Sequence, residues 1–199
     1  MKIAILGGSF DPPHLGHLFI AQEVLRLLAL DQVWLMPCAS HAFNKQLSPV
    51  KKRWAMCQLL QTDKIVAHDW EIKRGGVSYT WETLQQLEDK YPQHTFSWII
   101  GSDQLADFTQ WRCWQELLQT KQLVIFPRKN NIPTIKRQLL RLIKGKKLPE
   151  NIILMEGVQL NSSASSIIRQ RIEQQLSIQH LVGEKINLYL QQYAAKNKQ

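Results

Sequence analysis

Two histidines, His14 and His17, have the spacing that first points to chemistry. They lie three positions apart where a helix is predicted to begin, so both imidazoles should face the same side. A helix N-terminus offers unpaired N–H groups and a positive dipole end, which favour phosphate, and Gly16 removes a side chain that would block its approach. The pattern therefore predicts a phosphate site. Histidines that only cap the helix or lie on the surface are the alternative.

The residues just before the histidines suit the same kind of ligand. Gly7 and Gly8 end an apolar segment and let the backbone come close to a ligand, and Ser9 adds a hydroxyl and an N–H group. The string is neither GxGxxG nor GxxxxGK, so the standard dinucleotide and P-loop fingerprints are absent. No metal ligands are assigned, because no third His, Cys or acidic ligand stands at a recognisable spacing and structural zinc needs four.

A second group of polar residues begins another predicted helix near the C-terminus. Ser165 and Ser166 offer hydroxyls and free N–H groups there, and Arg169, one turn later, adds a forked cation. Asp103 follows Gly101 at the end of a predicted strand, where a carboxylate can accept a ribose hydroxyl. These residues predict a second phosphate contact and a ribose contact. An N-cap with a surface arginine, and an Asp that caps the next helix, are the alternatives.

Short apolar segments that alternate with helical periodicity must position these side chains. Strands are predicted at 2–6, 32–36, 64–67, 95–100, 122–126 and 151–155, and helices at 15–29, from 48 onward, at 80–91, within 130–147, at 165–175 and at 184–195. This alternation predicts an α/β fold, a doubly wound parallel sheet with helices on both faces. Right-handed crossovers place the strand C-termini at one edge, so ligands should bind just after each strand.

The positive charge of the chain is concentrated in one segment. The net charge is +9, and the segment 117–149 holds nine basic residues and no acidic one. These residues are Lys121, Arg128, Lys129, Lys136, Arg137, Arg141, Lys144, Lys146 and Lys147. A solvated basic helix face is one interpretation, and a patch that attracts nucleotide or RNA phosphate is the other.

Composition and cysteine use restrict the class of protein. The content of 44% hydrophobic and 21% charged residues excludes disorder and collagen-like structure, and the length predicts a single domain over 1–199 with a C-terminal helical part at about 163–195. Three widely spaced cysteines, with no CxxC pair, predict reduced thiols and a cytoplasmic location. No signal peptide or membrane span is predicted.

Several motifs together resemble one family. The string GGSFDPPHLGH at 7–17 resembles the nucleotidyltransferase superfamily signature GxFDxxHxGH, including its Phe10 and Asp11. The segments GVSYTWETL (76–84), IIGSDQLADFTQW (99–111), SASSIIR (163–169) and LVGEKINLYL (181–190) resemble, in order, further motifs of the bacterial nicotinate mononucleotide adenylyltransferases. The resemblance covers nearly the whole chain and implies a Rossmann-like nucleotidyltransferase fold with C-terminal helices.

The resemblance also implies an activity and roles for residues. The activity would be transfer of AMP from ATP to nicotinate mononucleotide, giving deamido-NAD and pyrophosphate in NAD biosynthesis, with Mg²⁺ bound to the ATP. Such in-line transfer depends on positioning and charge stabilisation. The implied catalytic residues are His14, His17 and Arg169. The implied ATP-binding residues are Gly7, Gly8, Ser9, Phe10, Gly16, Gly101, Asp103, Ser165 and Ser166, and the implied substrate-binding residues are Lys45, Thr80, Thr83 and Trp111, where Trp111 would stack on the pyridine ring.

Some positions depart from the family pattern and leave alternatives open. The loop PCASHAFNK at 37–45 differs from the family's Pro-Pro-His-Lys type, so a preference for nicotinamide mononucleotide or another small phosphorylated acceptor is one alternative. Gly183 stands where the family usually has Pro, and capping by Thr80 is an alternative to ligand binding. Sister transferases, a nucleotide sensor and an RNA-binding module are the remaining alternatives. The expected partners are ATP and the acceptor, with no membrane and no nucleic acid; a homo-oligomer is compatible with the sequence.

Overall fold

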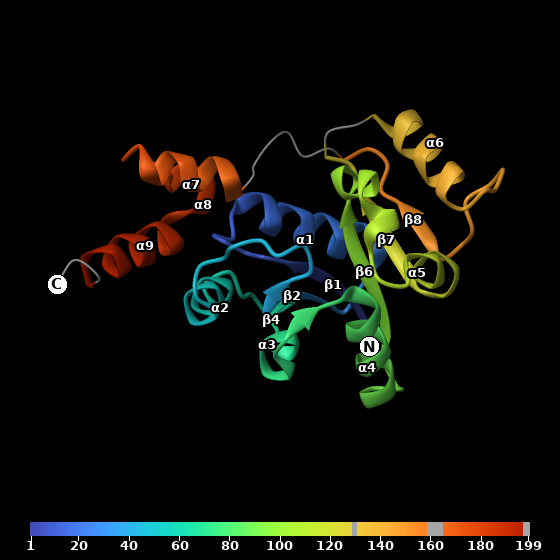
Figure 1. Cartoon of the computed structure of the whole chain (residues 1–199), viewed down its shortest axis with the longest axis horizontal. Coiled ribbons are helices and arrows are strands. Elements are labelled where there is room, and N and C mark those ends of the chain that lie inside the picture. Colours follow the sequence, from blue (N-terminus) through green and yellow to red (C-terminus); the bar gives the residue numbers. More distant parts are fainter. Residues whose placement is uncertain (129–130, 159–164, 197–199) are drawn as a thin grey trace.

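The central element is a parallel sheet whose strand order reverses direction at its middle. A computed structural model describes residues 1–128, 131–158 and 165–196. Within these residues six parallel strands form a sheet in the order β4-β2-β1-β6-β7-β8 (Figure 1). The strands are β1 (Lys2–Gly8), β2 (Gln32–Pro37), β4 (Ile65–Ala67), β6 (Thr95–Gly101), β7 (Gln122–Phe126) and β8 (Ile152–Leu154). All six strands were predicted at these places, and the doubly wound parallel sheet is confirmed.

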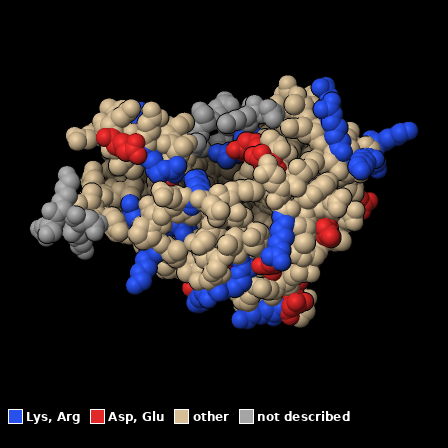
Figure 2. Space-filling view, viewed as in Figure 1, with Lys and Arg blue, Asp and Glu red and all other residues tan. Residues whose placement is uncertain are grey.

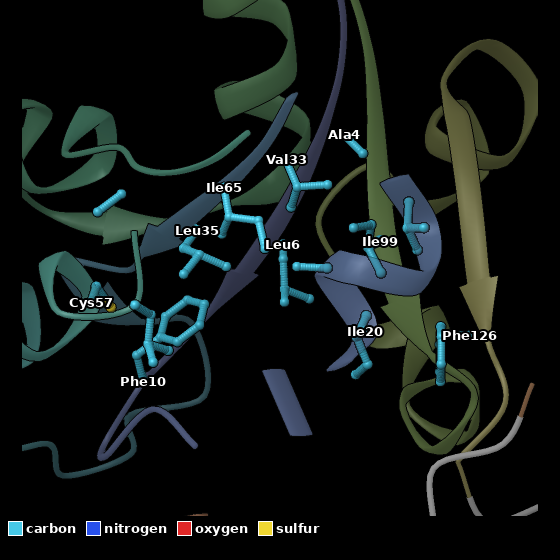
Figure 3. Packing of buried hydrophobic residues seen from close by; sticks show 14 of the residues in the cluster. Ala4, Leu6, Phe10, Ile20, Val33, Leu35, Cys57, Ile65, Ile99 and Phe126 are labelled. Carbon is cyan, nitrogen blue, oxygen red and sulfur yellow. The ribbon is translucent and has the colours of Figure 1, made fainter. Parts of the chain in front are cut away.

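Helices cover both faces of this sheet. The helices on one face are α1 (Leu15–Leu28), α2 (Val50–Gln58), α7 (Ser165–Glu173), α8 (Gln179–Val182) and α9 (Glu184–Lys196). The other face holds α4 (Thr80–Lys90), α5 (Trp114–Thr120), α6 (Ile132–Leu142) and the 3-10 helices η1 (Ser102–Ala106) and η2 (Phe108–Gln110). Each face buries its own apolar cluster, and Figure 3 shows part of the first, with Leu6 and Leu35 from the strands and Ile20 from α1.

The alternation of side chains along β1 explains the two clusters. Ala4 and Leu6 belong to the cluster beneath α1, whereas Ile3 and Ile5 belong to the cluster beneath α4. All four side chains are buried, as expected for a central parallel strand covered on both faces. The uniformly apolar start of the sequence is therefore a consequence of double burial.

The short elements were not predicted. They are a two-stranded sheet of β3 (Ser40–His41) and β5 (Val77–Ser78), the helix α3 (Trp70–Arg74), and α5, α8, η1 and η2. These elements are too short to show a periodicity in the sequence. Residues 163 and 164 of the predicted C-terminal helical part lie outside the described residues. Of the helices that are described, none is long and apolar enough to cross a bilayer.

The pairing between the two central strands, β1 and β6, ends before β1 reaches its C-terminus. β1 pairs with β6 from Lys2–Thr95 to Ile5–Trp98, but it stays paired with β2 up to Gly8–Pro37. The loop that leaves β1 therefore begins where pairing to β6 has already ended. In open parallel sheets this point, where the strand order reverses, is where ligands bind.

Trp98 fills the space between the parting strands. A Cβ atom built on Gly7 would lie 2.1 Å from Cζ2 of the Trp98 indole, far inside van der Waals contact. Gly8 is different, because its Cβ would meet only Phe10, at an ordinary 3.6 Å. The glycine at position 7 is therefore required by internal packing, whereas the sequence suggested that it makes room for a ligand.

We expect Gly7→Ala to destabilise the fold by about 2 kcal/mol, because the indole is rigid and must shift to admit a methyl group. Gly8→Ala is the matched control and should change the free energy of unfolding by less than about half of that amount. Urea unfolding of both variants measures the difference. Equal effects of the two substitutions would contradict this account of Gly7.

Candidate active site

The loop after β1 brings the two predicted histidines together. His14 is the N-cap residue of α1, and its backbone N–H donates to Nδ1 of His17 over 3.2 Å. The two imidazole rings are 3.8 Å apart between centroids, and the ring of Phe10 lies 4.7 Å from that of His17. The prediction that both imidazoles face the same side is confirmed. Phe10 itself is buried, so its ring packs against His17 from the side of the protein interior.

Both histidines are held neutral by their surroundings. Burial, and then the positive charge of Arg128, lowers the pKa of His14 to about 4. Burial, the neighbouring His14 and Arg128 also lower the pKa of His17 well below its usual range. Because Nδ1 of neutral His17 accepts a hydrogen bond, its proton must be on Nε2, which is then a donor. Nδ1 of His14 is buried and has no hydrogen-bond partner.

Arg128 is a site residue that the sequence analysis did not single out. It lies two residues after the end of β7. Its backbone N–H donates to Oγ of Ser102 over 3.0 Å, and its Nη1 donates to Oδ2 of Asp103 over 3.3 Å. Its charge is close enough to lower the pKa of both histidines. In the sequence Arg128 is one of nine basic residues in a single segment. Its position just after a predicted strand, where ligands are expected to bind, was the signal that could have identified it as a site residue.

Asp103 lies beside Arg128 at the end of β6. A Cβ on Gly101 would be 2.5 Å from Oδ1 of Asp103 and 2.7 Å from Cδ of Arg128, so the glycine lets these two side chains lie close over the end of β6. Oδ1 of Asp103 is buried and has no hydrogen-bond partner among the described residues, but the side chain as a whole is 28% exposed, so the carboxylate can accept a hydrogen bond at the sheet edge. Its predicted role, accepting a ribose hydroxyl, needs such an acceptor.

The C-terminal helix α7 is hydrogen-bonded to the same loop. Oγ of Ser165 donates to the carbonyl of Pro12 over 3.0 Å, and Nη1 of Arg169 donates to the carbonyl of Asp11 over 2.6 Å. The second predicted phosphate-binding group, on α7, therefore lies against the first, on the loop after β1, although the bonded residues are 153 and 158 positions apart in the sequence. Ser166, in contrast, is exposed.

The predicted acceptor residues on α4 differ from one another. Tyr79, with extended backbone, is the N-cap of α4 and no side chain caps the helix, so the interpretation of Thr80 as the cap is wrong. Thr83 is fully buried, and its hydroxyl donates to Oε1 of Glu71 over 2.7 Å. This corrects the expectation that Thr83 faces the acceptor, because no part of its side chain is open to a ligand.

The remaining predicted acceptor residues lie on exposed segments. Trp111 is partly exposed and packs against Phe108, with ring centroids 5.1 Å apart. Lys45 is exposed in the loop after β3, and its charge adds to burial in lowering the pKa of His41. No hydrogen bond or ion pair among the described residues joins either side chain to the histidine loop, so their roles stay predictions.

The two buried cysteines, Cys38 and Cys57, are unsuited to act as nucleophiles. Cys38 and Cys57 are buried, and burial raises the pKa of both thiols, so they stay protonated. No group of three His, Cys, Asp or Glu side chains within the described part of the chain could hold a metal ion. The described side chains of the site supply hydrogen bonding by imidazoles and charge stabilisation by arginine.

The basic segment does not form one patch. Figure 2 shows Lys and Arg side chains gathered over α6 and the residues after it. Lys121, however, is nearly buried and pairs with Glu88, and Arg128 belongs to the site. Lys129 lies outside the described residues. The solvated basic helix face was predicted at 130–147, and Lys136, Arg137 and Arg141 of α6 are exposed there, whereas Lys121 and Arg128 precede it.

Known proteins match the chain over nearly its full length. The cytidylyltransferase-like family model matches residues 5–171. A protein of Oceanobacillus iheyensis named "Probable nicotinate-nucleotide adenylyltransferase" is 33% identical over 195 residues, with 96% of this chain and 95% of that protein covered. A protein of the same name from a Synechococcus species is 36% identical over 197 residues, covering 96% and 95%. The chain belongs to the nicotinate-nucleotide adenylyltransferase family.

Solved structures show the same fold. The nicotinic acid mononucleotide adenylyltransferase of Plasmodium falciparum, complexed with NaAD, has a TM-score of 0.77 at 21% identity, over 96% of this chain and 95% of that one. The complex of the same Plasmodium enzyme with APC has a TM-score of 0.75. The adenylyltransferase described here is thus a nucleotidyltransferase with a Rossmann-like fold.

The depressed pKa values predict how stability depends on pH. In the unfolded chain a histidine titrates near pH 6.5, whereas His14 in the fold titrates at about 4. The unfolded state therefore takes up protons first, so stability is fully present above pH 6.5 and is lost as the pH falls toward 4, by about 1.4 kcal/mol per pH unit for each histidine.

Thermal melts from pH 7 to pH 4 measure this loss. The double variant His14→Asn with His17→Asn should lose less stability over this range than the wild type, because two of the groups that take up protons are gone. Parallel curves for wild type and variant would contradict the neutral state of the histidines.

Proposed function

We propose that this adenylyltransferase transfers AMP from ATP to nicotinate mononucleotide, giving deamido-NAD and pyrophosphate. The observation that carries the proposal is the convergence of two neutral imidazoles and Arg128 where the strand order of the sheet reverses. Hydrogen-bond donors and a cation at this edge fit a triphosphate.

The reaction is an in-line displacement. A phosphate oxygen of the acceptor attacks the α-phosphorus of ATP, and the bond between that phosphorus and the oxygen bridging to the β-phosphate breaks. Nε2–H of His17 donates to a phosphate oxygen on which negative charge builds up, and His14 adds a second ring donor beside it. The guanidinium groups of Arg128 and Arg169 offset the charge of the leaving pyrophosphate.

Mg²⁺ enters with the ATP. When bound, it neutralises charge on the phosphates, and it is held in such sites through substrate oxygens, water and few carboxylates. A chain without a cluster of three metal-ligating side chains among its described residues fits this mode. No protein ligand is therefore assigned to the ion.

Each substrate occupies its own side of the β1 loop. For ATP, the partly exposed carboxylate of Asp103 accepts a hydrogen bond from a ribose hydroxyl, and the backbone of the loop 7–17 approaches the phosphates. For the acceptor, Trp111 stacks on the pyridine ring and Lys45 holds the phosphate. The first N–H groups of α4, at Thr80 and the next residues, are not capped by a side chain and suit the nicotinate carboxylate.

The chain functions as one domain in this proposal. The family model extends from residue 5 to residue 171, and α7 is hydrogen-bonded to the loop after β1. Helices α1 and α7, from opposite ends of the chain, therefore both contribute to one site. A cytoplasmic location agrees with the substrates and with the protonated thiols.

Pyrophosphate release tests the reaction directly. The protein is incubated with ATP and Mg²⁺, and either nicotinate mononucleotide or nicotinamide mononucleotide is added. We expect release with nicotinate mononucleotide, because the uncapped amides of α4 favour a carboxylate. Release with neither acceptor would overturn the proposed activity. Equal rates with both would overturn only the preference for the acid.

His17→Ala should lower kcat by at least about 100-fold, since it removes the Nε2 donor. The melting temperature should change little, because the substitution removes only one hydrogen bond, from the N–H of His14. His180→Ala, which changes an exposed histidine of α8, is the matched control. A His17→Ala enzyme with wild-type turnover would remove this residue from the mechanism.

A further inference from the structure

Arg53 is a buried cation that forms no salt bridge within the described chain. It belongs to α2 and is only 1% exposed. Its Nε donates to the carbonyl of Ser48 over 3.0 Å, and its Nη1 to the carbonyls of Ser9 and Cys38 over 2.9 and 2.7 Å. Its Nη2 donates to the carbonyl of Ala39 over 3.1 Å. All of these acceptors are neutral backbone groups.

The four carbonyls belong to two different loops. Ser9 lies in the loop after β1, which carries the histidines, whereas Cys38, Ala39 and Ser48 lie in the segment between β2 and α2, which also carries Lys45. One nitrogen, Nη1, bonds to both loops at once. Two further hydrogen bonds of the described chain also join these segments: the N–H of Cys38 donates to the carbonyl of Gly8 over 2.9 Å, and the N–H of Ser48 donates to Oδ2 of Asp11 over 2.9 Å.

Stability alone does not account for a cation in this place. Burying a guanidinium without a counter-ion is expensive, and hydrogen bonds to neutral carbonyls offset only part of that cost. What an arginine supplies is a rigid fork of donors with fixed mutual geometry. A lysine could satisfy at most some of these carbonyls, from a flexible stem.

We propose that Arg53 is a positioning residue that sets the distance between the two halves of the active site. The inference rests on the proposed function, in which the loop after β1 holds the phosphates of ATP and the loop after β2 holds the acceptor nucleotide. The guanidinium fixes both loops, so it fixes the attacking phosphate relative to the α-phosphorus.

A consequence separates this role from a general effect on folding. ATP or nicotinate mononucleotide alone needs only its own loop, whereas the dinucleotide product spans both. Loss of the fixed distance should therefore weaken the dinucleotide more than either half, because the second half then binds with a lower effective concentration. It should also lower kcat, since a displacement of about 1 Å can cost 100-fold.

The experiment compares Arg53→Lys with the wild type and with Arg26→Lys. Arg26 forms an exposed salt bridge with Glu23 on α1, so its substitution is the same chemical change outside the site. We expect Arg53→Lys to change the Kd of ATP and of nicotinate mononucleotide by less than about threefold, to raise the Kd of deamido-NAD at least about tenfold, and to lower kcat about 100-fold. Arg26→Lys should change none of these values.

Equal losses for the three ligands, or no loss for the dinucleotide, would overturn the positioning role. If Arg53→Lys does not fold, hydrogen exchange in the wild type decides. Nicotinate mononucleotide alone should then slow exchange of the amides at 8–11, across the guanidinium, and independent loops would overturn the role. A wild-type protein that releases no pyrophosphate overturns the proposed function itself, whereas an active wild type with equal losses in the variant overturns only the role of Arg53.

Discussion

The end of pairing between β1 and β6 is the constraint on which the site depends. The two strands are neighbours up to Ile5 and Trp98, and beyond that point β1 is held only by β2. The indole of Trp98 packs against Gly7, in the position that a side chain of residue 7 would take, so the loop after β1 begins next to a packed indole. Because the strand order reverses here, the loops after β1, β2, β6 and β7 are all directed to one edge.

The electrostatics of the site follow from the charged and polar side chains that lie at that edge of the sheet. Arg128 comes from β7 and the histidines from the loop after β1, and the proximity of the arginine helps to keep the imidazoles neutral. A neutral imidazole costs less to bury than a charged one, yet it still donates a hydrogen bond. Arg128 therefore supplies positive charge at this edge, and the neutral histidines supply directed hydrogen-bond donors.

The sequence was sufficient for the sheet and for the histidine pair. All six strands are short apolar segments with clear stops, and the spacing of His14 and His17 on a helix fixes their common side. It was not sufficient for Arg53 and Thr83, because a basic residue in a helix and a threonine near a helix start are expected on the surface. Their burial is decided by carbonyls and a carboxylate that come from other elements.

The C-terminal helices complete the site instead of merely following it. Ser165 and Arg169 donate to carbonyls of the loop that leads into α1, and Ile168 and Ile186 are buried in the same cluster as Leu6. The segment from Ser165 onward therefore helps to hold the loop after β1 in position.

The turn between α8 and α9 fits this arrangement. Gly183 has a φ of +79°, which a proline cannot adopt, and a Cβ there would lie 3.4 Å from the side chain of Leu15 at the start of α1. The departure from the family's usual proline at this position is therefore a different backbone path. That path packs α8 closely against the helix that carries His17, and it connects the end of the chain to the geometry of the histidine pair.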